Sequence, residues 1–308
     1  MHTDSVIIQN LSKSYAKVEA LKDISLNVEK GEIFGFIGPD GAGKTTLFRI
    51  LVTLLIPDKG SVIVEGLDVV KDYKKIRKIV GYMPGRFSLY QDLSVEENLK
   101  FFARSFKTTI EENYYLIEDI YKHIEPFKKR LAGRLSGGMK QKLALSCALI
   151  HKPDILFLDE PTTGVDAVSR KEFWEMLRRL KEWGITIVVS TSYMDETALC
   201  DRVALIQDGN IMIIDTPSGI IETYERPIAY VKTNDMFSLV NDLHSIKDCH
   251  SAYRFGASVH YTPAGDTLDL KGLEDRLKTK GHSGIEIHRI RPEIEDCFMD
   301  LMSREEHV

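Results

Sequence analysis

The sequence predicts an α/β fold followed by a small α+β domain, and three observations lead to this expectation. A glycine-rich loop at 38–46 lies between an apolar run and a segment with apolar residues at helical spacing. Further apolar runs alternate with helix-patterned segments up to about residue 214. The pattern changes after Thr216-Pro217. We therefore expect one domain over 1–220 and a second over 225–308, which suits a chain of 308 residues.

The glycine-rich loop has the sequence G-x-x-x-x-G-K-T, the pattern of a phosphate-binding P-loop. Its glycines let several backbone N–H groups point into one concavity, and the helix N-terminus adds partial positive charge. Lys44 is expected to reach the β- and γ-phosphates, and the Thr45 hydroxyl to ligate Mg²⁺. The apolar strand at 32–37 and the helix pattern at 47–51 argue against a chance match. The predicted nucleotide site comprises Gly38, Pro39, Asp40, Gly41, Ala42, Gly43, Lys44, Thr45 and Thr46.

Short strands are expected on both sides of this loop and its helix. The chain suggests strands at 5–8, 21–28, 61–64 and 79–84, a turn at 57–60 and a solvated helix at 71–78. Tyr15 follows the first of these strands. An aromatic ring ahead of a P-loop can stack on a purine, although Tyr15 considered alone is better explained as a packing residue.

A helical insert is expected in the middle of the first domain. Residues 85–93 have a loop-like composition, and Ser94 and Glu97 form a capping box that opens a helix. From there to about Arg134 the chain shows no strand pattern and is rich in aromatic residues, Lys and Glu. We place the insert at about 86–138.

Two further motifs carry chemistry. In Leu135 to Gln141 (LSGGMKQ), Ser136 can cap the helix that runs to Ile150, and its two glycines expose N–H groups that form a second anion site. The apolar strand 155–160 then ends in Asp159 and Glu160. In a P-loop protein Asp159 would hold Mg²⁺ and Glu160 would act as base for an attacking water. The alternative, that the two carboxylates cap a helix, stays open on these residues alone.

The rest of the chain divides into two stretches of different pattern. The first domain continues with a loop at 161–166, a helix at 170–183, strands at 185–190, 203–206 and 211–214, and a hairpin turn at Asp208-Gly209. The second follows the order β-α-β-β-α-β of a ferredoxin-like domain, with elements at 228–231, 236–243, 252–255, 259–261, 273–277 and 285–290. Cys249, His250 and His260 lack metal-ligand spacing, so we expect them on the surface.

Composition narrows the classes of partner. The net charge of −5 argues against a nucleic-acid binder, and a hydrophobic content of 43% is ordinary for a globular protein. No apolar run approaches the ~18 residues that span a bilayer, and Met1 to Asp4 show no signal-peptide pattern. The four cysteines are widely separated, which indicates neither a zinc site nor a disulfide framework. We expect a cytoplasmic protein that meets a membrane only through a partner.

These motifs, in this order, resemble the nucleotide-binding subunit of an ABC transporter over roughly Ser5 to Gly219. Residues 38–46 resemble the family's Walker A, 135–141 its signature motif, 155–161 its Walker B and 163–166 its D-loop with Asp166. The resemblance implies a P-loop NTPase core with an antiparallel β subdomain, ATP and Mg²⁺ as cofactors, and Tyr15 at the adenine-stacking position. It also implies a head-to-tail dimer. In that dimer one subunit's Walker A and the other's Ser136, Gly137, Gly138 and Gln141 enclose the ATP.

Two positions depart from the family pattern. Gly85 stands where the family usually has a glutamine that ligates Mg²⁺ and senses the membrane partner, and Gln91 replaces it only if the loop is rebuilt. Ser192 stands where a histidine usually contacts the γ-phosphate and helps to hold the attacking water. A serine is about 3 Å too short for this without a bridging water. Either the changes are harmless drift, or the site binds ATP and turns over slowly.

Residues 291–298 resemble the P-x-[IL]-E-D-x-F tail common in ABC-2-type exporters. The resemblance implies an ATPase subunit on the cytoplasmic face of the membrane, docked on membrane subunits and paired with a second ATP-binding subunit. Mg-ATP would close the dimer, and hydrolysis with Glu160 as base would reopen it. Two alternatives remain. One is a regulatory subunit with negligible turnover paired with a more active homologue. The other is a soluble ABC ATPase acting on ribosomes or DNA, against which the acidic charge and the tail argue.

Overall fold

The structure is a computed structural model that describes residues 4–305, and it divides into two compact units, 1–217 and 218–308. The first three residues, on which the expectation of no signal peptide largely rests, lie outside the described residues. Each unit has its own hydrophobic core. Within the described residues, no helix is long and apolar enough to cross a bilayer.

The first unit is built on a six-stranded sheet in the order β10-β9-β3-β8-β7-β6. Five strands run parallel, and the edge strand β10 (Asn210–Asp215) is antiparallel to β9 (Arg202–Gln207). The other four strands are β3 (Ile33–Ile37), β6 (Val80–Met83), β7 (Ile155–Asp159) and β8 (Thr186–Thr191). Every residue of β3, β7 and β8 is buried, which is why these strands form near-continuous apolar runs in the sequence. The predicted α/β class is confirmed.

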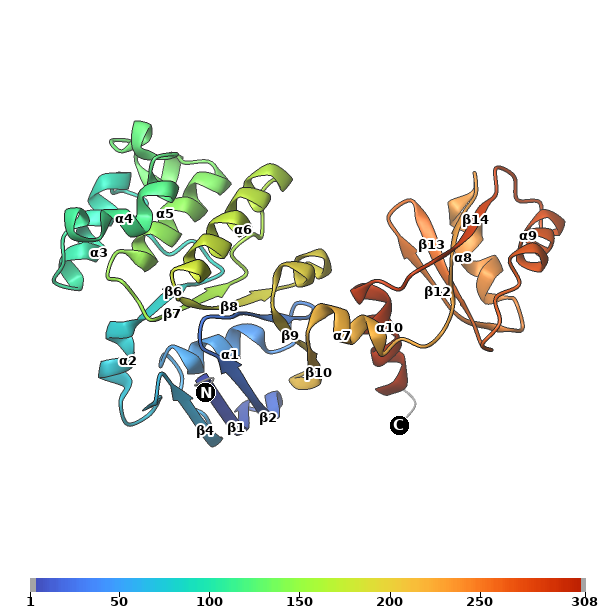
Figure 1. Ribbon diagram of the computed structural model, residues 1–308, viewed down its shortest axis with the longest axis horizontal. Helices are drawn as coiled ribbons and strands as arrows, with labels where there is room; N and C mark the ends of the chain where they lie inside the picture. Colours follow the sequence, from blue (N-terminus) through green and yellow to red (C-terminus); the bar gives the residue numbers. More distant parts are fainter. Residues whose placement is uncertain (1–3, 306–308) are drawn as a thin grey trace. The chain divides into compact units, whose positions relative to one another are not determined.

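A second sheet, entirely antiparallel, has the order β2-β1-β4-β5. Its strands are β1 (Asp4–Tyr15), β2 (Val18–Glu29), β4 (Lys59–Val64) and β5 (Leu67–Asp68). The helix α1 (Lys44–Leu51) lies between this sheet and the central one (Figure 1). One continuous apolar core joins α1 to both sheets through residues such as Phe36, Phe48 and Val64.

Helices occupy the middle of the first unit. They are α2 (Tyr73–Ile79), α3 (Val95–Ser105), α4 (Ile110–Tyr121), the 3₁₀ turns Glu125–Phe127 and Ala132–Arg134, and α5 (Gly137–Leu149). The predicted capping box of α3 is present. The Ser94 hydroxyl accepts from the Glu97 N–H at 3.3 Å, and the Glu97 carboxylate accepts from the Ser94 N–H at 2.8 Å. After β7 come α6 (Ala167–Glu182) and a 3₁₀ segment, Met194–Leu199, that the sequence patterns did not indicate.

The second unit begins within α7 (Pro217–Glu222), and its sheet has the strand order β12-β13-β11-β14, all antiparallel. The strands are β11 (Ile228–Lys232), β12 (Cys249–Phe255), β13 (Ser258–Pro263) and β14 (Glu286–Ile290), with helices α8 (Met236–His244) and α9 (Leu270–Thr279). Each βαβ unit therefore has a strand of the other between its own two, as in a split-βαβ domain.

One further helix, α10 (Ile294–Glu305), was not expected, and it corrects the expectation for His260. His260 was expected on the surface, but only 7% of it is exposed because it pairs with Asp296 of α10 at 2.9 Å. His250, which is exposed, pairs with Asp300 of the same helix at 3.2 Å, and Cys249 is half-buried. Asp296 belongs to the exporter-like tail and also accepts the Glu293 N–H at 2.8 Å. The exporter-like tail therefore begins a helix that pairs with the sheet of this unit through His250 and His260.

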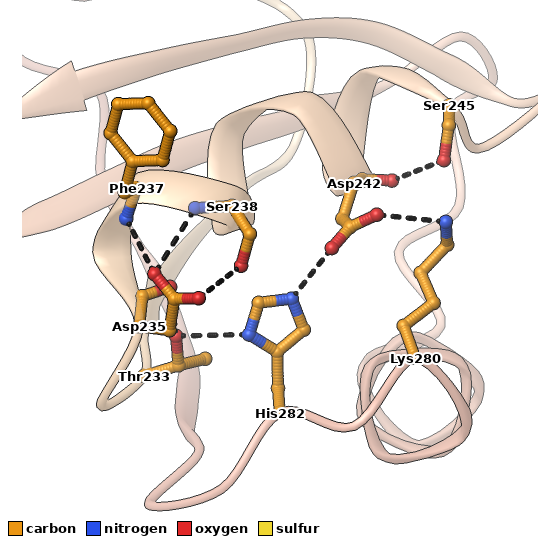
Figure 2. Close-up of polar contacts among 8 residues, drawn as sticks. All are labelled: Thr233, Asp235, Phe237, Ser238, Asp242, Ser245, Lys280 and His282. Atoms are coloured by element: carbon orange, nitrogen blue, oxygen red, sulfur yellow. Dashed lines mark hydrogen bonds and ion pairs between the residues drawn. The ribbon is translucent and has the colours of Figure 1, made fainter.

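A polar cluster connects β11, α8 and the segment after α9 in this unit (Figure 2). His282 is buried and lies between the Thr233 hydroxyl, at 3.3 Å, and the Asp242 carboxylate, at 3.0 Å. Lys280 donates to the second oxygen of Asp242 at 2.9 Å. Asp235 caps α8 by accepting from the backbone of Phe237 and Ser238. The polar groups of His282, Lys280 and Asp242 have hydrogen-bond partners within this unit, which indicates a structural role.

Candidate nucleotide site

The glycine-rich loop lies where parallel β3 ends and α1 begins, at the carboxyl edge of the central sheet. Gly43 is the N-cap of α1 with φ +104°, and a Cβ there would lie 2.4 Å from the Ala20 carbonyl oxygen. A Cβ on Gly38 would lie 2.1 Å from the Ile206 carbonyl oxygen. Both positions therefore require glycine, because any side chain would collide with backbone. The loop geometry expected from G-x-x-x-x-G-K-T is present.

Lys44 is held inside this loop with 4% of its surface exposed. Its Nζ donates to the Gly38 carbonyl at 2.7 Å and to the Pro39 carbonyl at 2.8 Å, and it lies 3.3 Å from the Glu160 carboxylate. The burial of this ammonium is compensated by the two carbonyls and by the Glu160 carboxylate, which fix its position beside the loop N–H groups. This is the arrangement that phosphate binding requires.

Thr45 and Asp159 form an oxygen cluster beside Lys44. The Thr45 hydroxyl donates to one Asp159 oxygen at 2.9 Å, and the Ser190 hydroxyl donates to the other at 2.6 Å. Asp159 is 2% exposed, at the end of β7. A hydroxyl and a carboxylate in contact are hard oxygen donors of the kind that Mg²⁺ prefers, so these residues fit that cation. The sequence analysis missed Ser190, although a polar residue opposite Asp159 in a buried strand was a usable signal.

Glu160 follows β7 with an unusual backbone conformation. Its φ is +48°, and its N–H donates both to the Ser190 carbonyl and to the Ser190 hydroxyl, each at 3.0 Å. A non-glycine residue in this region is uncommon and is held there by its surroundings. Its carboxylate faces Lys44 and the Thr163 hydroxyl. The helix-cap alternative does not apply, because the N-cap of α6 is Asp166.

These residues surround a cavity of about 610 Å³. Tyr15, at the end of β1 and 44% exposed, lines it together with Ala20, Asp40, Gly85 and the residues just described. Apart from Gly85, five lining residues were not among the predicted site residues: Ala20, Arg49, Tyr82, Pro84 and Arg86. Burial, and then the nearby charge of Asp159, raise the pKa of Tyr82 to about 12, so this phenol stays protonated at neutral pH.

The signature motif lies outside this cavity, at the start of α5. Ser136 caps that helix as expected, accepting from the Met139 N–H at 3.4 Å. A Cβ on Gly138 would lie 2.8 Å from the Ser169 hydroxyl, so glycine permits close approach of α5 to α6. Asp166 caps α6 by accepting from the Ser169 N–H at 3.0 Å. The signature and the D-loop residue therefore meet through Ser169.

The two departures from the family pattern have different surroundings. Gly85 lines the cavity, and a Cβ added to it would lie 3.1 Å from the Asp159 carbonyl oxygen. Ser192 follows β8 directly and is not one of the residues that line the cavity. It is nevertheless close to the loop, because the Gly38 N–H donates to the Thr191 carbonyl at 3.2 Å.

Comparison with known proteins agrees with this geometry. Residues 21–163 match the family described as ABC transporter. The chain is 42% identical over 307 residues to the "Probable multidrug ABC transporter ATP-binding protein YbhF" of Escherichia coli, covering 97% of this chain and 52% of that protein. It is 33% identical over 306 residues to "Nod factor export ATP-binding protein I" of Burkholderia lata, covering 96% of each. The chain thus spans about half of the first relative and nearly all of the second.

Solved structures share the fold of the first unit. The structure of cbiO1 from Clostridium perfringens, described as part of the ABC transporter complex cbiONQ, has 27% identity and a TM-score of 0.64, covering 71% of this chain and 91% of that one. A dimeric, post-hydrolysis ATP-binding cassette, MJ0796 bound to ADP and Pi, has 27% identity and a TM-score of 0.63, covering 68% and 98%. These similarities confirm the predicted P-loop NTPase fold.

Proposed function

The chain belongs to the family of ABC transporter ATP-binding proteins, and from this premise we propose that it binds and hydrolyses ATP to drive an ABC-2-type exporter. One observation carries the proposal. The buried Lys44 and the Thr45–Asp159–Glu160 cluster line the same cavity, and Tyr15 lines it as well. A triphosphate chain with an attached purine has groups that match each of these parts.

In the proposed reaction, this chain's residues position the phosphates and one water. Lys44 and the loop N–H groups hold the β- and γ-phosphates, and Tyr15 stacks on the adenine. Glu160 accepts a proton from the water as its oxygen bonds to the γ-phosphorus, while the bond to the ADP oxygen breaks. ADP and inorganic phosphate are the products. Thr45 and Asp159 are the residues that would hold Mg²⁺, which supplies charge neutralisation on the phosphates when bound.

Turnover at this site is proposed to be low in the isolated chain. Gly85 has no side chain to offer the phosphate, and the Ser192 hydroxyl cannot reach as far as a histidine. These two residues also favour a second candidate function, an ATP-binding regulatory subunit paired with a more active homologue. The two candidates differ only in whether this chain's own site hydrolyses ATP.

The partners proposed are a second ATP-binding subunit and membrane subunits, which would place the chain on the cytoplasmic face. The second subunit's signature motif would cover the phosphates of this cavity. For the membrane subunits we propose a separate, largely apolar cavity of about 340 Å³ lined by residues such as Leu89, Phe102 and Phe106. Tyr82 and Pro84 line both cavities. An occupant of the apolar cavity would therefore touch the same loop that borders the nucleotide.

Equilibrium titration with a fluorescent ATP analogue tests the proposal. Lys44→Ala removes the cation that the Gly38 and Pro39 carbonyls hold in the loop and that we propose contacts two phosphates, so binding should be nearly abolished. Lys100→Ala is the matched control, since this lysine lies on α3 in an exposed ion pair with Glu96. Unchanged affinity in Lys44→Ala would show that the cavity is not the nucleotide site. Equal losses in both variants would have the same meaning.

A further inference from the structure

Arg86 lines the nucleotide cavity and directly follows Gly85, which lies against Asp159 and Glu160. Strand β6 pairs in parallel with β7, and Met83 lies opposite Leu158. The residues that follow the two strands therefore lie at the same edge of the sheet. A Cβ on Gly85 would lie 3.1 Å from the Asp159 carbonyl oxygen and 3.7 Å from the Glu160 Cβ. The loop backbone therefore touches the end of β7, and the next side chain, that of Arg86, lines the cavity there.

Three basic residues, Lys44, Arg49 and Arg86, line the cavity, and the guanidinium of Arg86 is available to an anion. Lys44 is already engaged by two carbonyls and by Glu160. Within residues 4–305, by contrast, no carboxylate or carbonyl pairs with the Arg86 guanidinium. A guanidinium carries its charge at every physiological pH and presents donors in a fork that fits two phosphate oxygens.

The position of Arg86 relative to Tyr15 determines which phosphate of a bound nucleotide Arg86 can contact. Tyr15 and Ala20 belong to strands of the antiparallel sheet, whereas Arg86 directly follows Gly85, whose backbone lies against the end of β7. A nucleotide with its base on Tyr15 and its phosphates on Lys44 points its last phosphate towards Asp159 and Glu160. The group nearest Arg86 is then the terminal phosphate, which ATP has and ADP lacks.

We propose that Arg86 binds the terminal phosphate of ATP and makes this site distinguish ATP from ADP, at the loop where Gly85 offers no side chain. The inference rests on the proposed function, because it assumes that ATP occupies the cavity. Arg86 acts here as a binding and specificity residue. In this proposal, the charged side chain of Arg86 takes the place of the polar glutamine that the family usually has one residue earlier, at position 85.

Calorimetric titration of the full chain with Mg²⁺ and either ADP or a non-hydrolysable β,γ-imido analogue of ATP tests this. Arg86→Ala should weaken the imido analogue about tenfold, or ~1.4 kcal/mol, and leave ADP within about twofold. Arg86→Lys should fall between, because it keeps the charge and loses the fork. The matched control is Arg178→Ala, an exposed arginine on α6 that does not line the cavity, and it should change neither affinity.

The possible outcomes separate this inference from the function on which it rests. Equal weakening of ADP and the imido analogue by Arg86→Ala, or no weakening of either, would overturn the role of Arg86 while leaving the ATP site intact. Loss of both nucleotides in Lys44→Ala, with selective loss in Arg86→Ala, would support both claims. A wild-type chain that binds neither nucleotide would overturn both.

Discussion

Substitution of Ser190 tests whether its hydroxyl stabilises the carboxylate of Asp159 and the backbone of Glu160. It is fully buried in β8, donates its hydroxyl to Asp159 at 2.6 Å and accepts the Glu160 N–H at 3.0 Å. Ser190→Ala removes this hydroxyl and leaves one oxygen of a buried carboxylate without its partner. The Glu160 N–H keeps its bond to the Ser190 carbonyl at 3.0 Å, so the loss falls chiefly on Asp159.

The expected cost follows from the type of bond that is lost. A buried charged group deprived of its donor costs about 1–3 kcal/mol, so we expect the free energy of unfolding to fall by about 2 kcal/mol. Ser146→Ala is the matched control. Ser146 is equally buried, but its hydroxyl donates to the Lys142 carbonyl within α5. Because that is a neutral bond to a carbonyl of the same helix, its loss should cost only about 0.5 kcal/mol.

Urea unfolding in the absence of nucleotide measures both values. The chain has two tryptophans, Trp174 and Trp183, and both belong to the first unit, so their fluorescence follows that unit. The reasoning predicts a midpoint for Ser190→Ala clearly below that of Ser146→Ala with a similar slope. If the two variants unfold together, Asp159 is not held by Ser190 in the manner described.

Two further predictions concern the second unit. A chain ending at Gly219 should stay soluble and bind ATP. The reason is that the core around α1 uses residues 6–214, whereas the second core uses residues 229–287. Aggregation or lost binding would show that residues after 219 complete the first core. Hydrogen bonds from Lys280 and His282 hold the pKa of Asp242 below its usual 3.8. The ionised carboxylate therefore stabilises the folded state at pH values above 3.8, and this stabilisation is lost as the pH falls through the lowered pKa. The difference in unfolding free energy between wild type and Asp242→Asn should therefore shrink in acid, and a difference independent of pH would contradict this.

Much of the fold and site could be predicted because local chemistry specified it. The P-loop glycines, the Ser94–Glu97 capping box and the apolar runs of β3 and β7 each reflect a constraint within a few residues. The first strand was predicted too short because β1 has a register shift between Ile8 and Leu11, near Asn10 with φ +49°, which breaks the alternation of side chains.

What the sequence missed depended on contacts between distant segments. Ser190 matters because β8 lies beside β7, and Arg86 because the loop after β6 touches the end of β7. The burial of His260 follows from α10, a helix that begins inside a stretch identified only as a tail motif. Its apolar residues Ile294, Cys297 and Phe298 have helical spacing, so the signal was available.

Replacing the residues that depart from the family pattern should not have equal effects. Ser192→His adds a donor beside the loop that carries Lys44, and one preorganised donor is worth ~3 kcal/mol in the transition state. Gly85→Gln should add less, because its Cβ would lie 3.1 Å from the Asp159 carbonyl and the backbone must shift to admit it. Gly85→Ala is the control that isolates this shift.

Steady-state ATP hydrolysis by the purified chain tests the central claim most directly, when wild type is measured beside Ser192→His and Glu160→Gln. We predict slow hydrolysis by wild type, a gain of up to about a hundredfold in Ser192→His, and no activity in Glu160→Gln. A wild-type chain that already turns over many times per second, with no gain from histidine and no loss from Glu160→Gln, would contradict the account.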